Sequence, residues 1–295
     1  MNPVLKGYLQ LARPANLPTA AADILAGIAL SGALANGTAR PQLLYSLLLL
    51  VLSSILLYAG GVVLNDVCDA ELDNVERPER PIPSGRVPLY HAMWYGAILL
   101  IFGVTAAVWV GGLSGLIALV LAILIVAYDA FSKKYGFLGP LNMGICRALN
   151  LLLGMSILGE LPLWWIAGIP LTYIFAITLI SRGEVHGENK NHIIWAGVVY
   201  ILVILGVMVS IINKPGAMQA VPFLALFAFL IFKPLIKAYR YNSPKNIKKA
   251  VIAGVLSLIV LDAAFASGLS VWWYGLLIVL LLPLSLLLSK LFAVT

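Results

Sequence analysis

The chain has 295 residues, of which 62% are hydrophobic and 11% are charged, and its formal net charge is +7. Soluble globular domains carry about 25% charged residues, so this composition excludes that class. Apolar runs of membrane-spanning length recur throughout the chain and lack the alternating pattern of porin strands. We therefore expect an all-α polytopic membrane protein. The runs cover residues 16–35, 43–64, 88–110, 113–131, 138–158, 161–181, 193–212, 218–238, 248–268 and 271–292.

The number of spans depends on the two ends of the chain. The last two runs can be two spans, or one span and a surface helix, so the sequence predicts nine or ten transmembrane helices in a single domain, 1–295. The segment Ala33-Leu34-Ala35 resembles a signal-peptide cleavage site. However, Asp23 inside the first run, with Arg13 and Asn16 before it, favours a retained transmembrane helix.

Basic residues are distributed unevenly between alternate turns. The N-terminal segment and the turns after even-numbered runs carry most of them, whereas the opposite turns carry only Arg40 and Lys214. By the positive-inside rule, the N-terminus and the active site are expected on the cytoplasmic side, in a bacterial inner membrane. The positive charge is then a topology signal, and no nucleic-acid partner is expected. Cys68 and Cys146 are read as reduced thiols.

An acidic motif, Asn65-Asp66-x-x-Asp69-x-x-x-Asp73, follows the second run. If the helix continues through it, the three carboxylates share one helix face. Like charges on one face repel unless a cation lies among them, and Mg²⁺ prefers such oxygen ligands while taking others from a phosphate. The alternative is a solvated acidic helix end.

A second acidic segment follows the sixth run. Glu184 and Glu188, together with Ser181, repeat the spacing of the first motif. Both segments follow even-numbered runs and so reach the same membrane face, where two half-sites can hold one diphosphate through shared metal ions. Arg182 and His186 lie within this segment, and His186 is either a metal ligand, a base or neither.

Cations accompany the first motif. Three prolines and a glycine prevent a helix in the loop over 74–86, which carries Arg77 and Arg80. Guanidinium groups beside a metal cluster suit a diphosphate, although these arginines can also simply follow the positive-inside rule. Tyr128 and Lys133, at the end of the fourth run, can reach the same cavity.

Polar residues also interrupt the apolar runs. Asn142 and Arg147 lie in the fifth run, where a charge must face a cavity or a partner. A phosphate, a nearby acidic group or Asp262 of the ninth run can provide that partner. Arg13 and Asn16 lie one turn apart before the first run and can reach one pocket.

These residues resemble the UbiA superfamily of intramembrane prenyltransferases over essentially the whole chain. The motif Asn65-Asp66-x-x-Asp69-x-x-x-Asp73 matches the family's first motif at every specified position. The segment Arg80-Pro81-Ile82-Pro83-Ser84-Gly85-Arg86 is similar to the loop that follows it. The second motif departs, because Ser181-x-x-Glu184-Val185-x-Gly187-Glu188 stands where the family has Asp-x-x-Asp-Val-x-Gly-Asp. This variant is similar to the branch found in Ebo-type biosynthetic clusters of bacteria.

The resemblance implies a helical bundle around a central cavity open to the cytoplasm. It also implies Mg²⁺-dependent transfer of a prenyl group from a prenyl diphosphate donor to an unidentified small acceptor, with the prenyl tail facing the lipid bilayer. The catalytic residues would be Asn65 and the metal ligands Asp66, Asp69, Asp73, Glu184 and Glu188. The substrate-binding residues would be Arg13, Asn16, Arg77, Arg80, Tyr128, Lys133, Asn142, Arg147, Arg182 and His186.

Two other functions remain open from the sequence. The altered second motif is compatible with a terpene cyclase of the same scaffold, which ionises a prenyl diphosphate without an acceptor. A transporter or a non-catalytic binding protein would use the acidic face as an ion site. Against transport, both acidic segments are expected at one membrane face, whereas coupled transport sites usually lie near the bilayer midplane.

Overall fold

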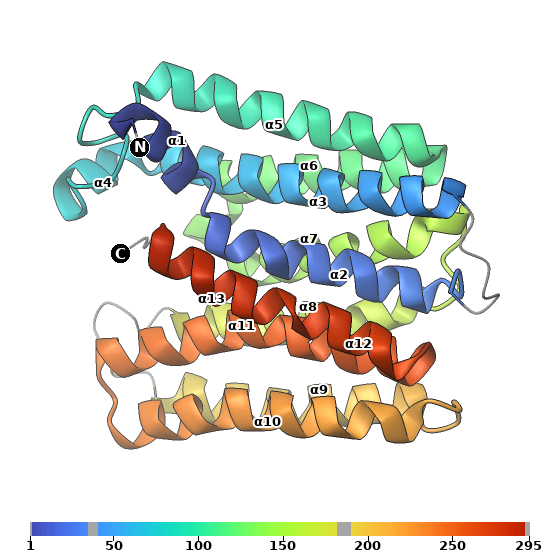
Figure 1. Ribbon diagram of the computed structural model, residues 1–295. Coiled ribbons are helices and arrows are strands. Elements are labelled where there is room, and N and C mark those ends of the chain that lie inside the picture. Colours follow the sequence, from blue (N-terminus) through green and yellow to red (C-terminus); the bar gives the residue numbers. More distant parts are fainter. Residues whose placement is uncertain (1, 35–40, 182–189, 293–295) are drawn as a thin grey trace.

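The computed structural model describes residues 2–34, 41–181 and 190–292. Within these residues, nine helices are long and apolar enough to cross a membrane. Their axes lie side by side in one bundle (Figure 1). The helices are α1 (Pro3–Leu11), α2 (Leu17–Leu30), α3 (Pro41–Cys68), α4 (Ala70–Glu76), α5 (Leu89–Val110), α6 (Gly112–Ala130), α7 (Leu138–Met155), α8 (Gly168–Ser181), α9 (Lys190–Ile211), α10 (Ala217–Arg240), α11 (Pro244–Leu269), α12 (Trp272–Val279) and α13 (Leu281–Leu291). Short 3₁₀ turns connect some of them: η1 (Pro14–Asn16), η2 (Ser132–Lys134), η3 (Ser156–Leu158) and η4 (Trp164–Ala167).

The predicted apolar runs correspond to these helices, but some bounds differ. The run 161–181 includes η4 ahead of α8, and α3 extends beyond both ends of the run 43–64. The first run, 16–35, continues beyond the end of α2 at Leu30. The helix ends there because Gly32 adopts a left-handed conformation, with φ of 78°, which is a common way to stop a helix. Helix α2, with 14 residues, lies in the bundle but is shorter than each of the nine candidate spans of the described residues. At the other end of the chain, α12 and α13 together form one candidate span, Trp272–Leu291.

Helix α2 lies between two hydrophobic clusters. Ile24 and Ile28 pack into a cluster with residues of α3, α5, α6 and α7. Ala22 and Ala26 pack into a second cluster, which is built mainly from α7 to α12. Almost every residue of α2 is consequently buried, although the helix is near the N-terminus.

Two glycines allow α2 and α7 to cross at close range. A methyl group on Gly27 of α2 would overlap the backbone carbonyl oxygen of Leu151. A methyl group on Gly154 of α7 would overlap the backbone carbonyl oxygen of Ile24. Small residues at such crossings let transmembrane helices pack backbone to backbone. The contact fixes the position of α2 relative to the cavity described below.

We expect Gly154→Ala to destabilise the protein by forcing α2 and α7 apart. Overpacking of this kind typically lowers the free energy of unfolding by about 1–3 kcal/mol. The measurement is the melting temperature in detergent. Gly197→Ala is the matched control, because a methyl group on Gly197 would be 3.6 Å from its nearest neighbour, on Leu235. An equal fall in melting temperature in both variants would contradict a close crossing of α2 and α7 at Gly154.

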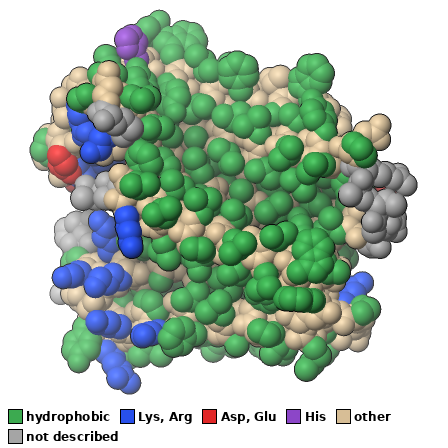
Figure 2. All heavy atoms as spheres, viewed as in Figure 1, with side chains coloured by type: hydrophobic (Ala, Val, Ile, Leu, Met, Phe, Trp, Pro, Cys, Tyr) green, Lys and Arg blue, Asp and Glu red, His purple; other side chains and the backbone are tan. Residues whose placement is uncertain are grey.

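The surface is apolar around its middle and basic at one end. Figure 2 shows hydrophobic side chains over most of this face, with Lys and Arg gathered at the end that carries α4 in Figure 1. The connection between α9 and α10, which holds Lys214, lies at the opposite end. This distribution agrees with the asymmetry of basic residues in the sequence.

Candidate active site

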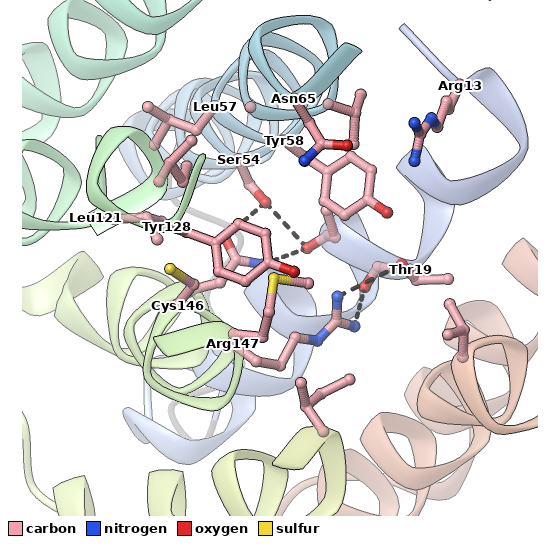
Figure 3. Close-up of a pocket in the computed structure, with 18 of the residues that line it drawn as sticks. Arg13, Thr19, Ser54, Leu57, Tyr58, Asn65, Leu121, Tyr128, Cys146 and Arg147 are labelled. Carbon is pink, nitrogen blue, oxygen red and sulfur yellow. Dashed lines mark hydrogen bonds between the residues drawn. The ribbon is translucent and has the colours of Figure 1, made fainter. Parts of the chain in front are cut away.

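A cavity of about 270 Å³ opens between α2, α3, α6, α7, α8 and α11 (Figure 3). Apolar side chains such as Leu57, Leu121 and Leu258 form much of its wall. A mostly apolar pocket with a few convergent polar groups is typical of a small-molecule site. Its polar lining residues are Arg13, Thr19, Ser54, Tyr58, Asn65, Tyr128, Asp129, Arg147 and Asn150.

The first acidic motif lies on a kinked pair of helices. Helix α3 ends at Cys68, and Asp69 separates it from α4, which begins at Ala70. Backbone hydrogen bonds from Asp69 to Asn65 (3.0 Å) and from Asp73 to Asp69 (2.8 Å) preserve the helical spacing across the kink. The helix is interrupted at Asp69, but the three carboxylates remain about one turn apart, as expected if the helix continued through the motif.

Two arginines from distant segments contact the motif. Nη2 of Arg13 lies 2.5 Å from Oδ1 of Asp66. Nη1 of Arg80 lies 2.6 Å from Oδ2 of Asp73 and 3.4 Å from Oδ1 of Asp66. Arg13 is also the one described residue other than glycine with a positive φ, 46°. Such a conformation is unfavourable for residues with a side chain and is found preferentially at functional sites.

A lysine also contacts the motif without lining the cavity, and a fourth carboxylate lies on the cavity wall. Nζ of Lys133, in η2, lies 2.6 Å from Oδ1 of Asp69. The side-chain amide of Asn65 donates a 2.7 Å hydrogen bond to Oδ1 of Asp129, a buried residue of α6. Asp129 is not among the site residues predicted from the sequence. The available signal was an acidic residue closing an otherwise apolar run, beside Tyr128.

The carboxylates suit Mg²⁺ chemically but face cations of the chain. Asp66, Asp69 and Asp73 supply the hard oxygen ligands that Mg²⁺ prefers. Each of them lies beside Arg13, Lys133 or Arg80, and no group of three metal-ligating side chains converges within the described ranges. The second-motif residues Arg182, Glu184, His186 and Glu188 lie outside the described residues. The metal site therefore stays a prediction.

Arg147 has a buried partner, as its position inside a span required. Its Nε lies 2.7 Å from Oδ2 of Asp23, while its Nη2 lies 4.0 Å from Oδ2 of Asp262. Nη2 also donates a 2.7 Å hydrogen bond to the carbonyl oxygen of Thr19, the residue toward which Arg147 points in Figure 3. The nearest carboxylate thus comes from α2 rather than from the ninth run. A contact of Arg147 with phosphate stays a prediction.

The remaining predicted residues occupy different surroundings. Tyr128 lines the cavity (Figure 3). Asn142 is buried and donates a hydrogen bond of 3.0 Å to Oγ of Ser132, so it links α7 to η2 without lining the cavity. Asn16 does not line the cavity either. Arg77 is exposed and makes none of the ion pairs found in the described part of the chain. Their contacts with substrate stay predictions.

The fold and the site define an integral multi-pass α-helical membrane protein, which has a mostly apolar cavity with several polar side chains beside an acidic motif. A sequence model of the UbiA prenyltransferase family matches residues 24–252. Because this match covers most of the sequence, the chain belongs to the UbiA prenyltransferase family.

Named relatives come from archaea. The digeranylgeranylglyceryl phosphate synthase of Sulfolobus acidocaldarius is 32% identical over 192 residues, which are 63% of this chain and 66% of the relative. That of Saccharolobus solfataricus is 34% identical over 198 residues, 64% of this chain and 67% of the relative. The chain thus spans just under two thirds of the length of the first of these relatives.

Solved structures show the same fold. A UbiA homologue from Archaeoglobus fulgidus bound to DMAPP and Mg²⁺ is similar over 88% of this chain and 99% of that chain, with a TM-score of 0.64. The sequence identity over this alignment is 14%, so the similarity extends to the helical architecture alone.

Proposed function

We propose that this protein is an Mg²⁺-dependent intramembrane prenyltransferase, which ionises a prenyl diphosphate and transfers the prenyl group to a small acceptor. The observation that carries the proposal is the convergence of Arg13, Arg80 and Lys133 on the first acidic motif, beside an apolar cavity. A prenyl diphosphate has the matching two parts, a polyanionic head and an apolar tail.

Each group of residues has a distinct role in this proposal. Asp66, Asp69 and Asp73, with Glu184 and Glu188 of the second motif, would hold Mg²⁺. When bound, Mg²⁺ neutralises the charge that develops on the leaving diphosphate. Arg13, Arg80 and Lys133 donate charge-assisted hydrogen bonds to diphosphate oxygens. The apolar wall around Leu57, Leu121 and Leu258 binds the prenyl tail and excludes water, which strengthens the electrostatic interactions at the head.

Related proteins support the proposed substrate class, and the distribution of basic residues supports the proposed membrane side. DMAPP is bound in the Archaeoglobus fulgidus structure, and the named relatives make a glyceryl phosphate that carries prenyl groups. The basic end of the bundle adjoins the first motif, and under the positive-inside rule this supports the proposal that the motif faces the cytoplasm.

The test is diphosphate release by the purified protein from dimethylallyl, farnesyl and geranylgeranyl diphosphates, with Mg²⁺ or with EDTA, followed by mass analysis of organic products. We expect release that depends on Mg²⁺ and a prenylated product once an acceptor is supplied. A cyclic product without any acceptor would instead identify a terpene cyclase. Absence of diphosphate release and of prenylated product from every donor, both without and with a cell extract as the source of acceptor, would contradict an enzymatic role and leave transport or binding to be measured.

A further inference from the structure

Asp129 differs from the other carboxylates at this end of the bundle. Asp66, Asp69 and Asp73 each lie within 2.6 Å of an arginine or lysine nitrogen. Asp129 makes no ion pair with any described residue, although it is only 4% exposed. Among the described residues that line the cavity, it is the one acidic side chain.

The chain holds this carboxylate in place from two directions. Helix α6 carries it beside Tyr128, and the amide of Asn65 on α3 donates a 2.7 Å hydrogen bond to its Oδ1. Lys133 lies one turn further along the chain but approaches Asp69 instead. A carboxylate offers about four lone-pair positions, and the bond from Asn65 occupies one. The group can therefore accept further hydrogen bonds from a molecule inside the cavity.

A buried carboxylate without a cation is costly for stability. Such a group is expected where it serves the chemistry of a site. Prenyl transfer releases a proton whenever the nucleophile is a hydroxyl group, and Asp129 is the one acidic side chain among the described residues that line the cavity. A carboxylate within hydrogen-bond reach of the nucleophile can both orient the hydroxyl group and accept its proton.

We propose that Asp129 binds the nucleophilic hydroxyl group of the acceptor and takes its proton during transfer. The inference rests on the proposed prenyltransferase function and deepens it. The bond between the prenyl C1 and diphosphate breaks, and its electron pair leaves on the diphosphate. The hydroxyl oxygen of the acceptor forms the new C–O bond, and its proton moves to the carboxylate of Asp129. The acceptor in this proposed step is an alcohol, and the product is a prenyl ether.

The test separates ionisation of the donor from transfer to the acceptor. Wild type, Asp129→Asn and Asp129→Glu are supplied with geranylgeranyl diphosphate and Mg²⁺. Diphosphate release is measured without acceptor, and ether formation is measured with two hydroxyl probes, geranylgeranylglyceryl phosphate and a 1-alkylglycerol. We expect Asp129→Asn to lower kcat for ether formation at least about a hundredfold more than it lowers diphosphate release. Asp129→Glu should recover part of the transfer, because it restores a carboxylate.

Three results would overturn the inference while leaving the proposed function intact. One is transfer by Asp129→Asn at the wild-type rate. Another is a parallel loss of release and transfer in Asp129→Asn, which would indicate a structural role or a role in donor binding. The third is wild-type release without ether formation from either hydroxyl probe. Absence of both diphosphate release and ether formation by wild type would instead remove the proposed function, and this inference with it.

Discussion

Asp66→Ala is expected to lower Mg²⁺-dependent diphosphate release by at least about a thousandfold. The variant removes a proposed metal ligand and also the carboxylate that Arg13 contacts at 2.5 Å. Arg80 keeps its closer partner, Asp73, at 2.6 Å, so the loop that carries Arg80 should stay in place. The measurements are release from geranylgeranyl diphosphate and, as a check on folding, the helical circular dichroism signal and elution profile in detergent.

Glu71→Ala is the matched control for this prediction. Glu71 lies on α4 between Asp69 and Asp73, is exposed and makes no ion pair with the described residues. Its removal changes the net charge by the same amount, yet activity should stay within about twofold of wild type, because exposed charges contribute little. Full activity in both Asp66→Ala and Asp69→Ala would show that the first motif is not the site.

Arg147→Met is expected to lower the free energy of unfolding by about 3–5 kcal/mol, the usual cost of removing one partner from a buried ion pair. The side chain of Arg147 is 8% exposed, and that of its partner Asp23 is fully buried. Without the guanidinium group, Asp23 and the nearby Asp262 would be two buried carboxylates with no cation beside them. The measurement is the melting temperature in detergent.

Two further variants test whether Arg147→Met loses stability because buried carboxylates are left without a cation. Asp23→Asn in the Arg147→Met background should recover part of the stability, because it removes one of the two buried carboxylates. Lys133→Met removes a cation whose partner, Asp69, is 28% exposed, so its cost should be below about 1 kcal/mol. If Arg147→Met and Lys133→Met lowered the melting temperature equally, burial of the ion pair would not determine its contribution to stability.

The helices could be predicted from the sequence because membrane-length apolar runs are a strong local signal. The end of α2 could not be located in the same way. The apolar run continues through Ala33-Leu34-Ala35, whereas the helix stops at Leu30 because Gly32 adopts a left-handed conformation. Hydropathy does not distinguish an apolar turn from an apolar helix.

The residues around the motif could be selected from the sequence, but not their partners. Arg13 contacts Asp66 across 53 residues, and Lys133 contacts Asp69 across 64. Such pairings are decided by how helices pack, which residue spacing does not encode. Asp129 was missed for a related reason. At the end of a run and close to lysines it is typical of a solvated helix end, and only its contact with Asn65 places it on the cavity wall.

The short, buried α2 has a consequence for biogenesis. Its 14 residues extend roughly 21 Å at 1.5 Å per residue, less than the hydrocarbon core of about 30 Å. Asp23 can form its ion pair only when Arg147 of α7 has been synthesised. The apolar side chains of α2 are fully packed only after α11 has joined the bundle. The earliest of these helices to leave the ribosome is therefore among the last to reach its final environment. A chain stopped before α11 should expose α2 to quality-control proteases.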